Sequence, residues 1–110
     1  MNGMKQARKR EIKEMVRRIV AGFDPEQVIL FGSHARGNTS PDSDVDLLVV
    51  MPVKKSRRRT AAEIGVALHD IRVAKDIIVT TPEAFSWRKD ICGTIEQPAF
   101  KEGKVLYARK

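Results

Sequence analysis

The sequence predicts a small α/β (α+β) fold, in which a mixed β-sheet of three to four strands packs against helices. We expect a single domain over residues 1–110, because this length is that of one ordinary domain. Two further observations support the fold class. Apolar residues recur at helical spacing near the N-terminus, and short segments rich in β-branched residues alternate with helical segments along the rest of the chain.

The first half of the chain is expected to hold one long helix and two strands. Residues 5–23 are predicted to be helical from apolar positions that share one face of a helix. These positions are Ile12, Met15, Val16, Ile19, Val20 and Phe23. The segment QVILFG is typical of a buried strand, the SPDS segment at 40–43 of a turn, and DVDLLVVM of a second strand that ends at Pro52.

The second half is expected to alternate between helix and strand. Thr60 is a plausible N-cap for a helix, with Glu63 completing a capping box. The segment KDIIVT is a third strand, and the TPE that follows resembles a helix start with proline in the first turn. Residues 83–102 are predicted to form one or two helices, interrupted near Gly93 and Pro98. The final KVLYA is predicted to be a short strand.

Composition narrows the class of protein. Hydrophobic residues make up 42% and charged residues 32%, which is typical of an ordered globular chain. No apolar run approaches the roughly 20 residues that a membrane helix needs, and the N-terminus is charged where a secretory signal is apolar. The single cysteine, Cys92, cannot form an internal disulfide. We therefore expect a cytoplasmic protein that makes no membrane contact.

The net charge of +7 is unevenly distributed. Residues 1–24 carry a net +4, residues 25–53 a net −3, and residues 54–59 (KKSRRR) a net +5. A basic exterior suits a polyanionic ligand, a nucleic acid or an acidic partner, although solvated surface charge explains the N-terminal helix equally well. The acidic segment within this basic chain suits a bound cation.

Two carboxylates, Asp44 and Asp46, begin the second predicted strand. Residues i and i+2 of a strand point to the same face, so these side chains are expected to project together. Paired carboxylates repel unless a proton or a cation lies between them, and Mg²⁺ takes such oxygen ligands together with substrate phosphates. Asp76, at the start of the third predicted strand, is a candidate third ligand if the two strands are neighbours. The alternative is a turn cap and a half-exposed strand residue.

The first predicted strand ends in a glycine-serine pair, Gly32 and Ser33. Backbone N–H groups in the following turn can bind a phosphate, the Ser33 hydroxyl can donate a further hydrogen bond, and Arg36 is placed to meet phosphate oxygens. The spacing of Gly32 and Gly37 approximates a P-loop. The P-loop lysine is absent, however, and a strand follows where a P-loop has a helix, so we reject that assignment.

The segment GSHARGNTSPDSDVDLLVV resembles the signature of the nucleotidyltransferases related to DNA polymerase β, most closely the minimal (MNT) members of that superfamily. The resemblance implies that Gly32 and Ser33 bind a nucleotide triphosphate and that Asp44 and Asp46 hold two Mg²⁺ ions. It implies that Asp76 completes the site of the ion that activates the attacking hydroxyl. Attack on the α-phosphorus of ATP would then release pyrophosphate and leave AMP on the acceptor.

Minimal members of this family also imply a partner. They often accompany a HEPN-domain toxin and act as its antitoxin by transferring AMP to a tyrosine of that toxin. Three alternatives remain open: a catalytically silent antitoxin that acts by binding alone, a small-molecule nucleotidyltransferase, and a nucleic-acid-binding protein that uses the basic surface. His34 could contact a phosphate or a base, Trp87 could pack in the core or face a partner, and residues 54–59 could dock an acidic partner or RNA.

Overall fold

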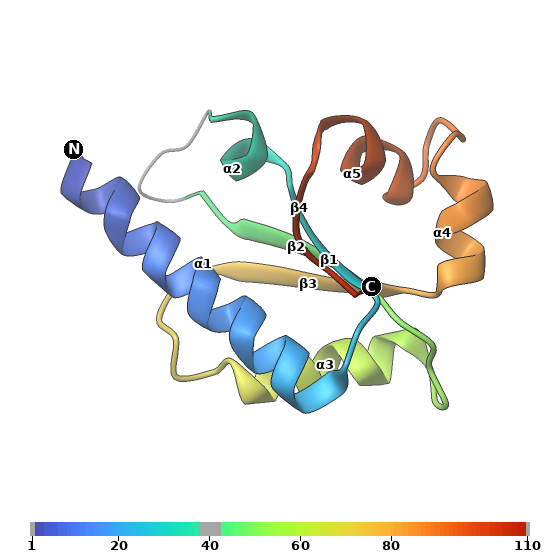
Figure 1. The fold of residues 1–110 in the computed structure, drawn as a ribbon, viewed down its shortest axis with the longest axis horizontal. Helices are drawn as coiled ribbons and strands as arrows, with labels where there is room; N and C mark the ends of the chain where they lie inside the picture. Colours follow the sequence, from blue (N-terminus) through green and yellow to red (C-terminus); the bar gives the residue numbers. More distant parts are fainter. Residues whose placement is uncertain (1, 38–42, 110) are drawn as a thin grey trace.

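The computed structural model describes residues 2–37 and 43–109. In that part of the chain the helices are α1 (Asn2–Phe23), α2 (Ser33–Arg36), α3 (Arg57–Ala67), α4 (Pro82–Arg88) and α5 (Glu96–Glu102). The strands are β1 (Gln27–Phe31), β2 (Val45–Val50), β3 (Lys75–Thr80) and β4 (Lys104–Ala108). The predicted α/β fold with its small mixed sheet is confirmed (Figure 1).

The four strands form one sheet in the order β3-β2-β1-β4. β1 lies antiparallel to both β2 and β4, whereas β2 and β3 are parallel. Parallel neighbours need a crossover connection, and α3 provides it between β2 and β3 (Figure 1). This parallel pair aligns the first residues of β2 with the first residues of β3 at one end of the sheet.

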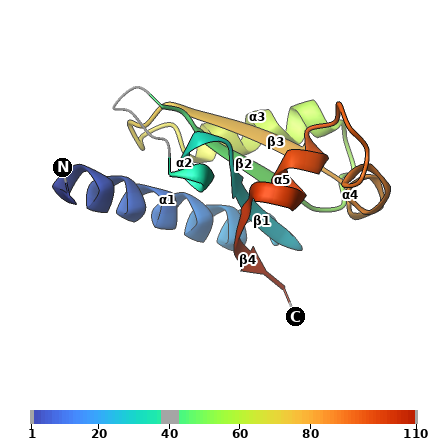
Figure 2. The ribbon, with the colours of Figure 1, turned by 90° about the horizontal axis from the view of Figure 1, so that it is seen from above.

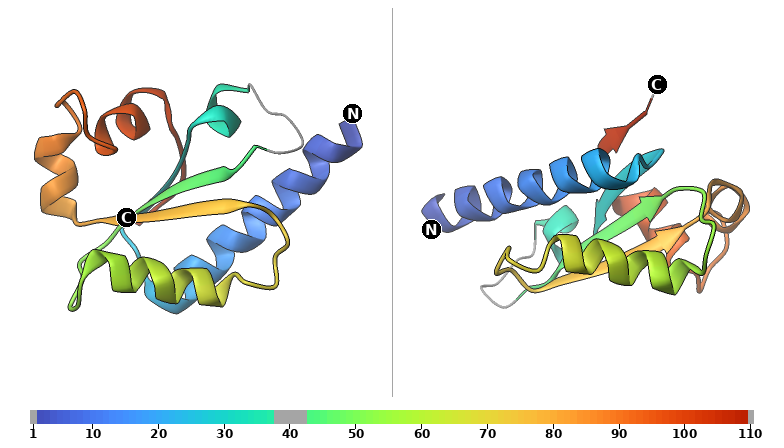
Figure 3. Two further views of the ribbon diagram at one scale, coloured as in Figure 1. Left: turned by 180° about the vertical axis from the view of Figure 1, so that it is seen from behind. Right: turned by 90° about the horizontal axis from the view of Figure 1, so that it is seen from below.

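The two faces of the sheet pack against different helices. Residues such as Leu47 and Val49 belong to the cluster that includes Met15 of α1 and Ile64 of α3. Seen from below, α1 and α3 lie in front of the sheet (Figure 3). The alternate residues, among them Leu48, pack with buried side chains of α4 and α5, and Figure 2 shows the other side, with α2 and α5 in front of the sheet. No helix in the described part of the chain combines the length and the apolar character that crossing a membrane requires.

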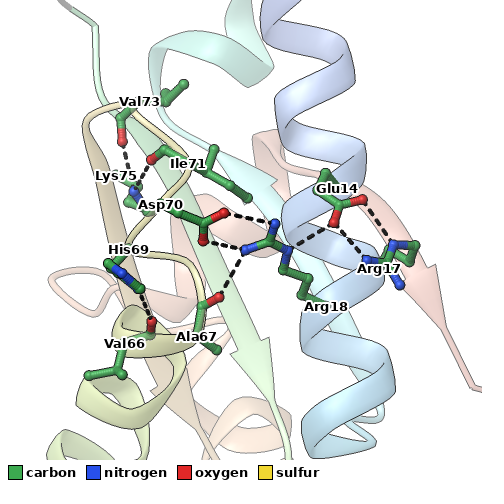
Figure 4. A network of polar contacts seen from close by, with 10 residues as sticks. All are labelled: Glu14, Arg17, Arg18, Val66, Ala67, His69, Asp70, Ile71, Val73 and Lys75. Atoms are coloured by element: carbon green, nitrogen blue, oxygen red, sulfur yellow. Dashed lines mark hydrogen bonds and ion pairs between the residues drawn. The ribbon is translucent and has the colours of Figure 1, made fainter.

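A polar network joins α1 to the C-terminal end of α3 (Figure 4). Arg18 donates hydrogen bonds to both carboxylate oxygens of Asp70, at 2.6 and 3.1 Å, and one to the carbonyl of Ala67. Arg18 also donates to Glu14 at 2.8 Å, and Arg17 donates two bonds to the same carboxylate. The network therefore holds together the two helices that cover one face of the sheet.

Two predicted local features are wrong. The N-cap of α3 is Ser56, whose hydroxyl accepts a hydrogen bond from the Arg59 amide, whereas Thr60 lies inside the helix and bonds the Ser56 carbonyl. Pro98 does not interrupt the last helix, because it lies in the first turn of α5, where an N–H has no intrahelical partner to lose. The predicted break at Gly93 is confirmed, and residues 40–42 of the predicted turn lie outside the described residues.

Candidate active site

Asp46 and Asp76 lie opposite each other at the start of the parallel strands β2 and β3. The strand register pairs Asp46 with Asp76, between the pairs Val45–Lys75 and Leu47–Ile77. Because paired residues of neighbouring strands point to the same face, both carboxylates lie on the side that α4 and α5 partly cover. Asp46 is half-buried and Asp76 is exposed. The strand pairing on which the candidacy of Asp76 depended is present.

Asp44 precedes the strand by one residue and is exposed. The next residue, Val45, anchors the chain, because its amide donates a hydrogen bond to the Ala74 carbonyl at 2.8 Å. Asp44 is close enough to Asp46 for its negative charge to raise the pKa of that residue. The sequence thus predicted the proximity of the two carboxylates, although only Asp46 is part of the regular strand.

Gly32 brings the end of β1 against Asp46. Its φ of 74° and ψ of −154° lie in a region that is essentially restricted to glycine. A Cβ at this position would also collide with Oδ2 of Asp46. The glycine is therefore required twice, by its backbone conformation and by the close approach of the carboxylate.

Ser33 and Arg36 are the first and last residues of α2, the single helical turn that follows Gly32. The amides of Ala35 and Arg36 donate to the Gly32 carbonyl, whereas the first N–H groups of a helix have no intrahelical acceptor. Ser33 is half-buried beside this turn. Arg36 is exposed and points one guanidinium nitrogen at Glu102 of α5, at 3.5 Å. Such a long, exposed ion pair is weak, so Arg36 remains available to an anion.

The electrostatics of the site centre on Asp46. Burial raises the pKa of the Asp46 carboxyl above its usual range, and the negative charges of Asp76 and Asp44 raise it further. The positive charges of His34 and Arg36 act in the opposite direction. The folded chain therefore concentrates negative charge at this end of the sheet, which a bound cation would relieve.

The donor set fits Mg²⁺, because the three carboxylates offer only oxygen ligands. Within residues 2–37 and 43–109, no three His, Cys, Asp or Glu side chains are arranged so that they could hold a metal ion by themselves. Mg²⁺ commonly uses one or two carboxylates, with phosphate and water oxygens completing its shell. The arrangement is thus suited to a metal ion that arrives with a phosphate-bearing ligand.

His34 has a role that sequence reasoning did not anticipate. Its Nε2 lies 3.2 Å from the carbonyl oxygen of Ser43, the residue before Asp44. This contact ties α2 to the chain that leads into β2. His34 therefore helps to position the segment that leads to Asp44, in addition to contributing charge. In the sequence, only the spacing from Gly32 to Asp44 could have suggested this contact.

Comparison with known proteins shows which family and fold the chain is similar to. Residues 9–104 match the family model described as a nucleotidyltransferase domain. The chain is 30% identical over 103 residues to a candidate protein adenylyltransferase of Methanocaldococcus jannaschii, in an alignment that covers 87% of this chain and 94% of that protein.

Solved structures share the fold. A candidate nucleotidyltransferase of Sulfolobus solfataricus superposes with a TM-score of 0.64 and 24% identity, over 91% of this chain and 79% of that one. A toxin–antitoxin protein solved with AMP-PNP superposes with a TM-score of 0.55 and 19% identity, over 92% of this chain and 73% of that one. At these identities the likeness concerns the fold.

Proposed function

We propose that this chain, which belongs to the nucleotidyltransferase domain family and is a nucleotidyltransferase, transfers AMP from ATP to a protein hydroxyl. The observation that carries this proposal is the convergence of Asp46, Asp76 and Gly32 at one end of the sheet. It brings paired carboxylates together with a turn suited to phosphate. We also propose a cytoplasmic location, which would supply ATP as the donor.

Each site residue has a role in the proposed reaction. The turn from Gly32 through Ser33 binds the triphosphate, and Arg36 meets its outer oxygens. Asp44 and Asp46 hold Mg²⁺, and Asp76 serves the acceptor side of the site. When bound, the metal supplies positive charge for the entering and leaving oxygens of an in-line displacement. The acceptor oxygen forms a bond to the α-phosphorus as the bond to pyrophosphate breaks, and the hydroxyl proton passes to the Asp76 carboxylate or to solvent.

Relatives support a protein as the acceptor. The Methanocaldococcus relative bears the name of a protein adenylyltransferase, and a structural neighbour is a toxin–antitoxin protein with a bound ATP analogue. Together with the motif, which resembles that of MNT proteins, this supports a tyrosine of a HEPN-type toxin as the acceptor. In that pairing the chain acts as the antitoxin.

The test uses purified protein, Mg²⁺ and ATP labelled at the α or the γ position. The acceptor is a HEPN-type protein encoded beside this chain, or failing that a lysate of the source cells. We expect transfer of α label only, with loss of transfer in the Asp44→Asn/Asp46→Asn double variant and after chelation of Mg²⁺. Mass spectrometry then identifies the modified residue.

Two other results would overturn the proposal. Equal binding and neutralisation of the partner by wild type and double variant, without label transfer, would identify an antitoxin that acts by contact alone. Label recovered only on small molecules of the lysate would identify a small-molecule nucleotidyltransferase. Transfer to a serine or threonine would retain the chemistry and correct the acceptor.

A further inference from the structure

A groove lies beyond the catalytic carboxylates, between β3 and the segment that joins α4 to α5. Its volume is about 610 Å³. We call it the α4–α5 groove. The lining residues that matter for its chemistry are Arg57, Ile78, Trp87, Arg88, Ile91 and Ile95. None of these residues has a role in the transfer reaction described above.

The walls of the α4–α5 groove are unusually apolar for exposed surface. The side chains of Trp87, Ile91 and Ile95 are 59%, 41% and 44% exposed, and all three come from a stretch of nine residues. Phe100 of α5 is 49% exposed nearby and packs edge-on against Phe85. Clustered apolar exposure marks a surface that a partner covers, and tryptophan is a frequent anchor of such contacts.

The charge on the rim is positive. Arg57 lies in the first turn of α3 within the basic segment 54–59, and no described acidic side chain is within ion-pair distance of it. Arg88 stacks over Trp87, with its guanidinium carbon 5.1 Å from the ring centroid. Glu96, the acidic residue of the lining, is 4% exposed, and its carboxylate accepts a hydrogen bond from Thr80 at 2.7 Å and lies 3.9 Å from the Arg88 guanidinium. Arg57 is therefore the lining cation that has no acidic partner among the described residues. The groove thus complements an acidic ligand.

A polypeptide fits this surface better than RNA does. Single-stranded RNA is held by aromatic side chains on which its bases stack. Trp87 is the aromatic residue that lines the groove, and the Arg88 guanidinium lies over its ring. The isoleucines that make up much of the wall offer no stacking surface, but they suit aliphatic side chains of a protein.

One lining residue of the groove, Ile78, lies near the catalytic end of the sheet. Asp76 and Ile78 are two residues apart on β3, so they share a face and lie about 7 Å apart along the strand. A segment that occupies the groove at Ile78 can therefore place a neighbouring side chain at Asp76. This is the carboxylate expected to face the acceptor.

We propose that the α4–α5 groove binds a segment of the acceptor protein that has an apolar face with acidic residues beside it, and thereby presents the acceptor hydroxyl to Asp76. The occupancy of the groove follows from its own chemistry. The identification of its occupant as the acceptor rests on the proposed function.

Cys92 provides a direct probe of occupancy. It is the one cysteine of the sequence, it is exposed, and it lies between Ile91 and Gly93, which both line the groove. The test measures the rate of Cys92 alkylation with a synthetic amphipathic peptide that carries leucines, one tyrosine and glutamates. A peptide with lysines in place of the glutamates and a single-stranded RNA run alongside. The experiment needs neither ATP nor Mg²⁺.

We expect the acidic peptide to slow alkylation, and the lysine peptide and the RNA to leave the rate unchanged. Trp87→Ala and Arg57→Gln should each weaken peptide binding by about tenfold, which corresponds to about 1.4 kcal/mol. The matched controls are Val66→Ala, which removes an apolar side chain 71% exposed on α3, and Arg58→Gln, the adjacent arginine outside the groove lining. Both should bind as wild type does.

The outcomes separate the two proposals. Absence of protection by the acidic peptide, or equal binding by Trp87→Ala, overturns the groove assignment, and protection by RNA alone reassigns the surface to nucleic acid. In the transfer assay, Trp87→Ala should raise KM for the acceptor protein and leave the affinity for ATP unchanged. Normal transfer by Trp87→Ala overturns only the role in acceptor binding, whereas no transfer by wild type overturns the proposed function.

Discussion

Asp46 of β2 and Asp76 of β3 are direct partners across the parallel strand pair. Like charges placed opposite each other on neighbouring strands are destabilising, so this relationship costs the metal-free fold some of its stability. Burial raises the pKa of Asp46 most, and the negative charges of Asp76 and Asp44 raise it further. Conflicts of this kind between stability and charge are typical of functional sites.

Asp46→Asn should stabilise the metal-free protein while abolishing nucleotidyl transfer. The expected gain is about 0.2–1 kcal/mol at neutral pH, the range for cross-strand pairs. Because the folded-state pKa of Asp46 lies above its ordinary value of 3.8, the penalty for ionisation is complete above the raised pKa and disappears as pH falls to about 3.8. Thermal unfolding of wild type and variant over this pH range measures the gain.

A control of opposite sign is Asp70→Asn, because Arg18 holds the pKa of Asp70 at about 2. This substitution should destabilise the protein at neutral pH. A large loss of stability in metal-free Asp46→Asn would contradict the assignment of Asp46 to a site of repelling carboxylates.

Gly32→Ala should damage both the fold and the site. The backbone conformation of Gly32 costs other residues about 1–3 kcal/mol, and the new methyl group would push the Asp46 carboxylate aside. We therefore expect lower stability in urea titrations and a large loss of transfer. Gly37→Ala is the matched control, because Gly37 also has a positive φ, of 79°, yet among the described residues no atom beyond its chain neighbours lies within 4 Å of its added Cβ. It should lose stability and retain transfer; equal transfer losses would show that the contact with Asp46 is unimportant.

Arg18→Ala should weaken the protein above about pH 4.5 and have little effect near pH 2. The hydrogen bonds from Arg18 hold the pKa of Asp70 at about 2, and Arg17 and Arg18 do the same for Glu14. Lowered carboxyl pKa values stabilise the fold above the unfolded-state values of 3.8 and 4.5, and this stability is lost as pH falls toward 2. Melting curves against pH test the expectation.

Arg17→Ala serves as the control for that network. It removes the exposed pair with Glu14 and keeps the link from Arg18 to Asp70, so its effect should be smaller. The expectation fails if the stability of Arg17→Ala and that of Arg18→Ala change with pH in the same way between pH 2 and pH 4.5.

Thr80→Val should destabilise the protein by about 1–3 kcal/mol. The Thr80 hydroxyl donates a 2.7 Å hydrogen bond to the buried Glu96 carboxylate, and valine leaves that carboxylate without this donor. Thr80→Ser retains the donor and should lose less. Chemical denaturation compares the two variants, and equal losses would assign the effect to packing.

Local sequence patterns were sufficient for the elements of the fold. Strand assignments from QVILF and KDIIVT are confirmed, as is the helix start at Thr81, whose side chain accepts from the Ala84 amide. The predicted N-cap of α3, Thr60, was wrong, because Ser56 caps the helix and Thr60 lies inside it. Burial decided this: Thr60 is 6% exposed and faces inward.

The sequence by itself determined that the chain has a nucleotidyltransferase motif and that Asp44 and Asp46 lie close together, because residues separated by one position cannot be far apart, whether or not both belong to a strand. Only the tertiary structure decided that Asp76 faces Asp46, that Gly32 packs against Asp46, and that Arg36 reaches Glu102. Those contacts join residues from 14 to 66 positions apart. Strand order and register bring such residues together. Both depend on how the two apolar faces of the sheet are covered by helices, and no local sequence pattern encodes that covering.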